Sequence, residues 1–105
     1  MAGPGNGTGI SSIRSYTFFR DGVIAAPGTY VANGPFDFID PDGTPFLSKS
    51  IMLINDAGTD VWFSFDGVAD AFRVRSGEPV THDFRRARKV WFRGTAGAIY
   101  RFAAW

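Results

Sequence analysis

Apolar and polar side chains alternate along several short segments of the chain. Val61, Phe63 and Phe65 alternate with Trp62 and Ser64. The same period of two recurs further along, in residues 72–75, 90–93 and 99–104. Because successive side chains of a β-strand point to opposite faces of a sheet, this pattern predicts half-buried strands with one face toward a core.

Turn signals built from glycine, proline and aspartate separate these segments at short intervals. Asp21-Gly22, Pro27-Gly28 and Asp66-Gly67 are examples, since glycine tolerates a positive φ and proline fixes its own. The segments between turns are rich in β-branched and aromatic residues and comprise 13–20, 29–32, 36–39, 50–55, 61–65, 71–75, 80–85, 89–93 and 98–104. No stretch of the sequence has apolar residues at the 3.6-residue spacing of an amphipathic helix. The pattern predicts an all-β fold, a small antiparallel β-sandwich or jelly roll of about eight or nine short strands.

Residues 51–54, with the sequence Ile-Met-Leu-Ile, are apolar on both sides of the expected strand. A strand that is apolar on both faces lies centrally in a sheet or is covered by another subunit. We therefore expect this segment at the centre of a sheet or in an interface.

The chain begins with MAGPGNGTG, which holds four glycines and a proline and offers nothing apolar to bury. This composition predicts a flexible N-terminal arm over residues 1–9, either a disordered tail or an arm ordered by a neighbouring subunit. The remaining length suits one domain, so we expect a single β-sandwich domain over residues 10–105.

Composition narrows the possible chemistry. There is no cysteine, which excludes disulfides, thiolate catalysis and cysteine-ligated zinc, and there is only one histidine. A formal net charge of +1 is too balanced to argue by itself for nucleic acid or an anionic membrane. Without an apolar run of about 18 residues or a secretory signal pattern, we expect a soluble, unexported protein with no membrane partner and no cofactor.

The single histidine, His82, lies in an alternating segment next to Asp83. Consecutive strand residues point to opposite faces, so Asp83 is poorly placed to orient the imidazole. No Gly-x-Ser-x-Gly motif is present to supply a nucleophile. We predict no catalytic residue and no enzymatic activity.

Asp40-Pro41-Asp42-Gly43 resembles the beginning of a calcium-binding loop. The acid that such a loop needs at its twelfth position falls on Ile51, so we predict a tight turn and no metal site. Other aspartates that might be paired for hydrolysis all lie in or beside turn signals, where solvated turn residues explain them: Asp56, Asp60, Asp66 and Asp70.

Basic residues are most concentrated at Arg85, Arg86, Arg88 and Lys89, just before Trp91. Three interpretations remain open: a solvated hairpin end, a protein interface, for which arginine and tryptophan are enriched, or a platform for single-stranded nucleic acid, which we consider the least supported. As interface candidates we take these five residues together with two isoleucines behind the arm, Ile10 and Ile13.

The second half of the chain resembles small virion proteins of tailed bacteriophages. The resemblance rests on SIMLINDAGTDVWFSFDG, SGEPVTHDFRR and KVWFRGTAGAIYRFAAW, and it covers about residues 50–105. It implies a capsid decoration or cement protein, a compact β-sandwich that is often trimeric and binds the outer face of a head shell. Residues 29–45 match nothing in that pattern.

The resemblance makes a virion structural protein the leading hypothesis. Its partners would be the major capsid protein or other virion proteins, it would form a homo-oligomer with a trimer favoured, and it would be made in the host cytoplasm and located on the capsid surface. One alternative is a neck, tail or fibre component. Another is a carbohydrate-binding β-sandwich, because Trp62, Trp91 or Trp105 could stack on sugar rings, although Trp105 is expected to pack on the core.

Overall fold

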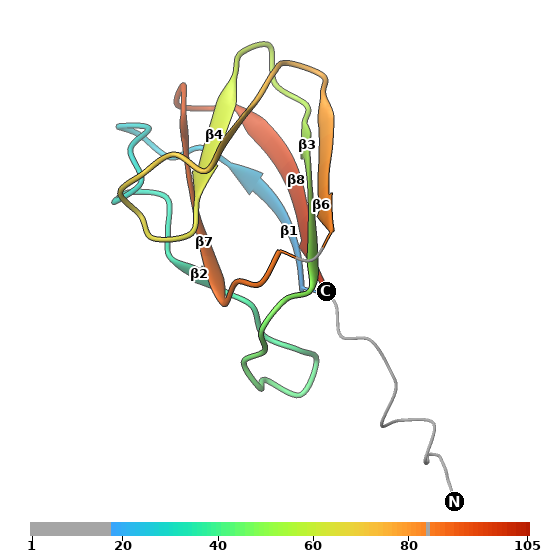
Figure 1. Ribbon diagram of the computed structural model, residues 1–105. Coiled ribbons are helices and arrows are strands. Elements are labelled where there is room, and N and C mark those ends of the chain that lie inside the picture. The colour runs from blue at the N-terminus through green and yellow to red at the C-terminus, as the bar shows by residue number, and fades with distance from the viewer. Residues whose placement is uncertain (1–17, 84) are drawn as a thin grey trace, which may run out of the picture.

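A computed structural model describes residues 18–83 and 85–105, and in this part of the chain eight strands form two four-stranded antiparallel sheets (Figure 1). The strands are β1 (Phe18–Val23), β2 (Phe36–Asp37), β3 (Ser50–Asn55), β4 (Val61–Ser64), β5 (Phe72–Val74), β6 (Pro79–Asp83), β7 (Lys89–Gly94) and β8 (Ile99–Ala104). The first sheet has the order β1-β8-β3-β6 and the second the order β2-β7-β4-β5. The predicted small antiparallel β-sandwich is confirmed. The predicted arm, residues 1–9, lies outside the described residues.

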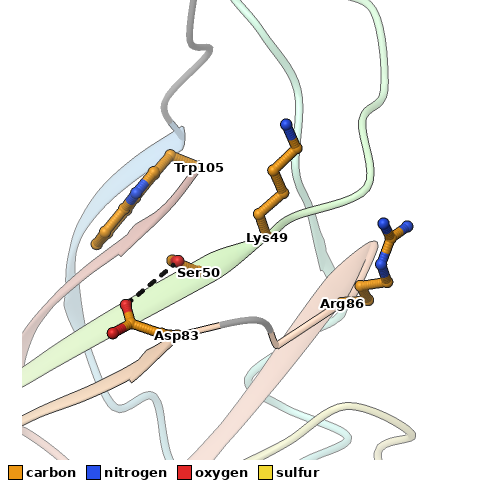
Figure 2. A pocket seen from close by; sticks show the side chains of 5 residues that line it. All are labelled: Lys49, Ser50, Asp83, Arg86 and Trp105. Atoms are coloured by element: carbon orange, nitrogen blue, oxygen red, sulfur yellow. Dashed lines mark hydrogen bonds between the residues drawn. The ribbon is translucent and has the colours of Figure 1, made fainter.

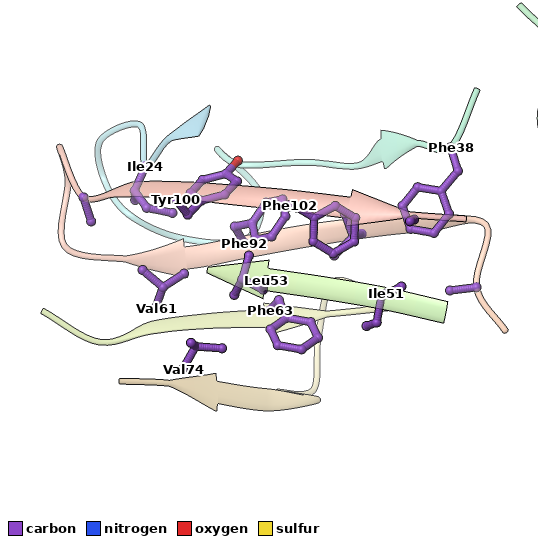
Figure 3. Close-up of a cluster of buried hydrophobic side chains, with 14 residues drawn as sticks. Ile24, Phe38, Ile51, Leu53, Val61, Phe63, Val74, Phe92, Tyr100 and Phe102 are labelled. Carbon is purple, nitrogen blue, oxygen red and sulfur yellow. The ribbon is translucent and has the colours of Figure 1, made fainter. Parts of the chain in front are cut away.

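The core lies between the sheets, where alternate residues of both converge (Figure 3). The centroid of the Phe92 ring on β7 lies 4.1 Å from that of Tyr100 and 5.4 Å from that of Phe102, both on β8. Ile51 and Leu53 of β3 are buried in the same cluster. β3 pairs with β8 on one side and β6 on the other, so of the two predicted positions, central or in an interface, it has the central one within its sheet.

The prediction of a turn at Asp21-Gly22 is wrong, because both residues lie within β1. Asp21 pairs with Arg101 and Gly22 with Tyr100 of β8. A Cβ at Gly22 would collide with the Tyr100 ring. The glycine therefore makes room for an aromatic side chain between the sheets and leaves the strand unbroken.

The strand predicted over residues 29–32 is also wrong, because these residues form turns. The side chain of Asn33, which is buried, holds this loop together. Its Nδ2 donates to the carbonyls of Ala25 and Thr29 at 3.0 and 2.8 Å, and its Oδ1 accepts from the Ala25 N–H at 2.6 Å. A local side chain thus replaces the strand ladder that the apolar residues indicated.

The turn predicted at residues 40–43 is confirmed. The N–H of Gly43 donates to the carbonyl of Asp40 at 2.9 Å, and Gly43 has a positive φ. The Asp40 carboxylate accepts from the N–H groups of Asp42 and Thr44, each at 2.9 Å, so these hydrogen bonds stabilise the turn.

In the part of the chain described, no helix has the length and apolar composition needed to cross a membrane.

Candidate functional site

The outward-facing side of the first sheet carries apolar side chains. β1 contributes Phe19 and Val23, whose residues are 75% and 56% exposed, and Ile99 of β8 is 52% exposed. We call this surface the outer face; it consists of Phe19, Val23, Met52, Ile54, Ile99 and Ala103. Soluble monomers rarely expose contiguous apolar patches larger than a few hundred Å², and patches of that size commonly mark interaction sites.

Strand register brings these side chains together. Phe19 lies opposite Ala103, which lies opposite Met52 of β3, so three neighbouring strands supply one apolar row. Val23 lies opposite Ile99 in a second row. Because side chains directly opposite one another on antiparallel strands are in contact range, each row is continuous across its strands.

One ion pair lies between the two apolar rows. Its arginine belongs to β8, and its aspartate directly follows β3. Arg101 of β8 donates from Nε and Nη2 to the Asp56 carboxylate at 2.7 and 3.2 Å. Asp21 of β1 lies opposite Arg101 on the other side. The outer face therefore combines exposed apolar side chains with oriented charge, a composition typical of a surface that binds a specific partner.

A pocket of about 440 Å³ lies at one end of the first sheet, next to the outer face (Figure 2). Its lining residues come from three separate parts of the sequence and comprise Lys49, Ser50, Asp83, Arg86 and Trp105. Ser50 and Asp83 are paired across β3 and β6, and the Ser50 hydroxyl is 3.5 Å from the Asp83 carboxylate. Trp105 is half-buried and lines this pocket; it does not belong to the core cluster.

The structure separates the arginines of the predicted basic interface from one another, whereas the Lys89 ammonium lies 5.8 Å from the Trp91 ring centroid. Arg86 lines the pocket just described, whereas Arg85 stacks over the Phe65 ring at 4.4 Å and lines a second hollow with Asp66 and Asp70. Arg88 and Lys89 are exposed beside the edge strand β2. Ile10 and Ile13 lie outside the described residues.

Ser48 positions the basic segment. Its hydroxyl donates to the carbonyl of Arg85 at 2.6 Å and accepts from the N–H of Ala87 at 3.0 Å. Ser48 is fully buried, so these two bonds fix the backbone on both sides of Arg86. The arginine side chains are thereby directed to different surfaces.

Trp91 is half-buried on the outward side of the second sheet. A Cβ added at Gly34 or Gly67 would fall 2.6 or 2.7 Å from the indole, so two loops approach the ring closely. Both glycines have a positive φ, which suits turns that approach an aromatic ring. Trp91 therefore holds two loops in place and presents little free ring surface.

A second cluster on the same side links Trp62, Arg93, Asp70 and Tyr30. The Arg93 guanidinium lies 4.2 Å from the Trp62 ring centroid and donates from Nε and Nη2 to Asp70 at 2.9 and 2.6 Å. The Tyr30 hydroxyl donates to the same carboxylate. Arg93 and then Tyr30 lower the pKa of Asp70 to about 2, while burial and the neighbouring carboxylate raise the pKa of Tyr30.

Asp70 should make stability depend on acid pH. A carboxyl group whose pKa is lowered on folding stabilises the folded protein above its unfolded pKa, near 4, and loses that effect as the pH falls toward about 2. We expect Asp70→Asn to be less stable than wild type at pH 7, with a difference that closes between about pH 4 and pH 2. Urea titrations across this range measure it. Tyr30→Phe should show a smaller difference of the same sign, and a pH-independent difference for Asp70→Asn would contradict the proposed pairing.

His82 faces the second sheet and stacks on Phe72, with ring centroids 3.8 Å apart. Burial, followed by the nearby Arg85, lowers the pKa of the imidazole. Asp83 points away and lies near Ser50, as expected for consecutive strand residues. Among the described residues, no group of three or more His, Asp or Glu side chains is placed to bind a metal.

The outer face was not predicted from the sequence. The strand expected over residues 13–20 ends at the Asp21-Gly22 turn and so leaves out Val23, and alternation alone does not decide which of the adjacent Phe18 and Phe19 faces outward. The segment 51–54, which is apolar on both sides, was the available signal for an apolar outer surface.

No protein-family model matches the chain, and a search of curated proteins finds no match either.

Proposed function

We propose that this chain is a structural protein of a tailed-phage virion, specifically a capsid decoration protein that binds the outer surface of the head. The observation that carries the proposal is the apolar outer face of the first sheet, with Phe19, Val23 and Ile99 more than half exposed. A surface of this kind suits a domain whose exposed apolar side chains are buried by a partner in a larger assembly. The resemblance of residues 50–105 to virion proteins supports the phage particle as that assembly.

The outer face offers enough apolar surface to anchor a partner. Fully burying a valine, isoleucine or phenylalanine contributes about 1.5–3 kcal/mol each, so three such side chains supply several kcal/mol before the costs of association. The Arg101–Asp56 pair can fix the orientation of the partner, because charged groups at an interface contribute mainly to specificity. A homotrimer, at a local threefold axis of the shell, is the oligomer that the resemblance favours.

The role would be mechanical. A protein that binds the assembled shell and not its dissociated subunits stabilises the shell by its binding free energy, about 2.7 kcal/mol per site when its free concentration is one hundred times the Kd. The partner would then be the major capsid protein.

Cosedimentation with undecorated heads tests the proposal. We expect the wild-type protein to pellet with the heads and to raise their melting temperature, and Phe19→Asp to lose both effects, because it puts a charge at the most exposed position of the outer face. Val31→Asp is the matched control, since Val31 is even more exposed than Phe19 but lies in the loop after β1.

Three results would contradict parts of the proposal. Wild-type protein that does not bind heads removes the decoration role, and binding to tails or necks in its place would assign the protein to that part of the particle. If Phe19→Asp binds as well as wild type, the outer face is not the contact surface. Native mass spectrometry of the wild-type protein tests the trimer separately.

A further inference from the structure

The pocket at the end of the first sheet is built on a rigid backbone frame. The N–H groups of Lys49 and Ser50 donate to the carbonyl of Trp105 at 2.6 and 2.9 Å, and the N–H of Trp105 donates to the carbonyl of Ser50 at 3.0 Å. The backbone at Arg86, across the pocket from Trp105, is held by Ser48, whose hydroxyl hydrogen-bonds to the residues before and after Arg86. A preorganised pocket loses less free energy to ordering when a ligand binds.

The lining residues supply three kinds of contact. Lys49 and Arg86 provide positive charge, and neither is in an ion pair within the described residues. The side chain of Trp105 provides a flat apolar surface beside Ser50 (Figure 2). The Asp83 carboxylate and the Ser50 hydroxyl provide hydrogen-bond acceptors. A volume of about 440 Å³ is within the range of small-molecule sites.

We propose that this pocket binds an acidic sugar, a pyranose ring that carries a carboxylate. The apolar side of the ring would stack on Trp105, the carboxylate would lie between Lys49 and Arg86, and the ring hydroxyls would donate to Asp83. Each of the three kinds of lining group then has a partner on one small ligand.

Asp83 distinguishes this ligand from other anions. An acidic sugar has one carboxylate, which can lie at Lys49 and Arg86, and several hydroxyls that can donate hydrogen bonds to Asp83. An acidic peptide carries a carboxylate on each acidic residue, and Asp83 would repel those that do not lie at the two cations. Single-stranded nucleic acid is typically bound by several aromatic side chains along a basic groove, whereas one aromatic residue is among the described residues that line this pocket. The sugar is therefore the class that uses every lining group.

Isothermal titration calorimetry with glucuronic acid, and with glucose as its neutral counterpart, tests the proposal on the full chain. We expect glucuronic acid to bind at least about tenfold more tightly than glucose, because only it can form charge-assisted bonds with Lys49 and Arg86. The double variant Lys49→Gln and Arg86→Gln should lose this preference, and Trp105→Ala should lose saturable binding of both sugars. Arg75→Gln is the matched control, because Arg75 is exposed and lies outside the pocket.

Two further probes, an oligoglutamate peptide and a short oligothymidylate, identify the competing classes. Tighter binding of either one than of glucuronic acid would overturn the proposal, as would equal affinity for glucose or no saturation by glucuronic acid in the millimolar range. The double variant changes only exposed side chains, so its unfolding midpoint should match wild type. Head binding by these variants is measured separately, and Phe19→Asp should still bind glucuronic acid.

Discussion

Replacing Phe92 by alanine is expected to lower the free energy of unfolding by about 3–5 kcal/mol. Phe92 has no solvent exposure, and its ring packs against those of Tyr100, Phe102 and Phe36 at centroid distances of 4.1, 5.4 and 5.9 Å. Truncation leaves a cavity between the sheets that rigid strands cannot close. Since small domains have total stabilities of about 5–15 kcal/mol, the variant should unfold at a much lower urea concentration.

Phe19→Ala is the matched control for this experiment. The Phe19 residue is 75% exposed on the outer face, so its truncation should change the free energy of unfolding by no more than about 0.5 kcal/mol. Equal losses for the two variants would show that Phe19 is buried in the free protein, for example in an oligomer. Repeating the titration at several protein concentrations separates these cases, because the stability of an oligomer depends on concentration.

Gly28→Ala is expected to lower the free energy of unfolding by about 2–5 kcal/mol. This loss is the sum of two costs, that of an alanine in a left-handed backbone conformation and that of an added methyl group in a packed site. Gly28 has a φ of 84°, and a Cβ there would collide with the carbonyl oxygen of Gly94. The N–H of Gly94 also donates to the carbonyl of Gly28 at 3.0 Å, so the loop cannot move away without losing this bond. Thermal unfolding followed by circular dichroism measures the loss.

Gly43→Ala separates the two contributions. Gly43 has a nearly identical φ of 85°, but a Cβ at this position would meet nothing within 4 Å. It should therefore lose only the backbone contribution, about 1–2 kcal/mol. If the two alanine variants are equally destabilised, the approach of the Gly28 loop to Gly94 is looser than the structure indicates.

The two sheets present outward sides of different character. On the second sheet, Arg93 and Asp70 satisfy one another and Trp62 is covered by the guanidinium. On the first sheet, Phe19 and Ile99 have no comparable cover in the described residues. A partner that buries the first sheet's outer face gains hydrophobic free energy and can leave the Arg101–Asp56 pair intact, which is why we propose docking on that side.

Strands with a clear period of two were predictable from the sequence. The alternating segments around β4, β5 and β7 differ from the structure by a residue or two at their ends. Alternation works there because each strand has one face in the core, and burial selects apolar side chains on that face alone. Residues 50–55, which coincide with β3, do not alternate and were bounded by the turn signals on either side.

Local signals misled where a distant contact decided the conformation. Asp-Gly is a common turn sequence, but at Gly22 the glycine serves the Tyr100 ring, which is far away in the chain. The apolar residues around Tyr30 indicated a strand, but hydrogen bonds from Asn33 fold them into turns. In both places the local sequence is compatible with two structures, and tertiary contacts select one.

The sequence by itself determined the all-β class and the sandwich, because these follow from periodicity and from the need to bury apolar faces. For β3 it left two possibilities, a central strand or a strand in an interface. The sequence also shows that arginines are concentrated in residues 85–88. Only the tertiary structure decided which surfaces result. The outer face depends on the register between β1, β8 and β3, and the pocket joins Lys49, Arg86 and Trp105 from distant positions. Contacts between segments far apart in the chain leave no periodic trace in the sequence, so these two surfaces became visible only in the folded protein.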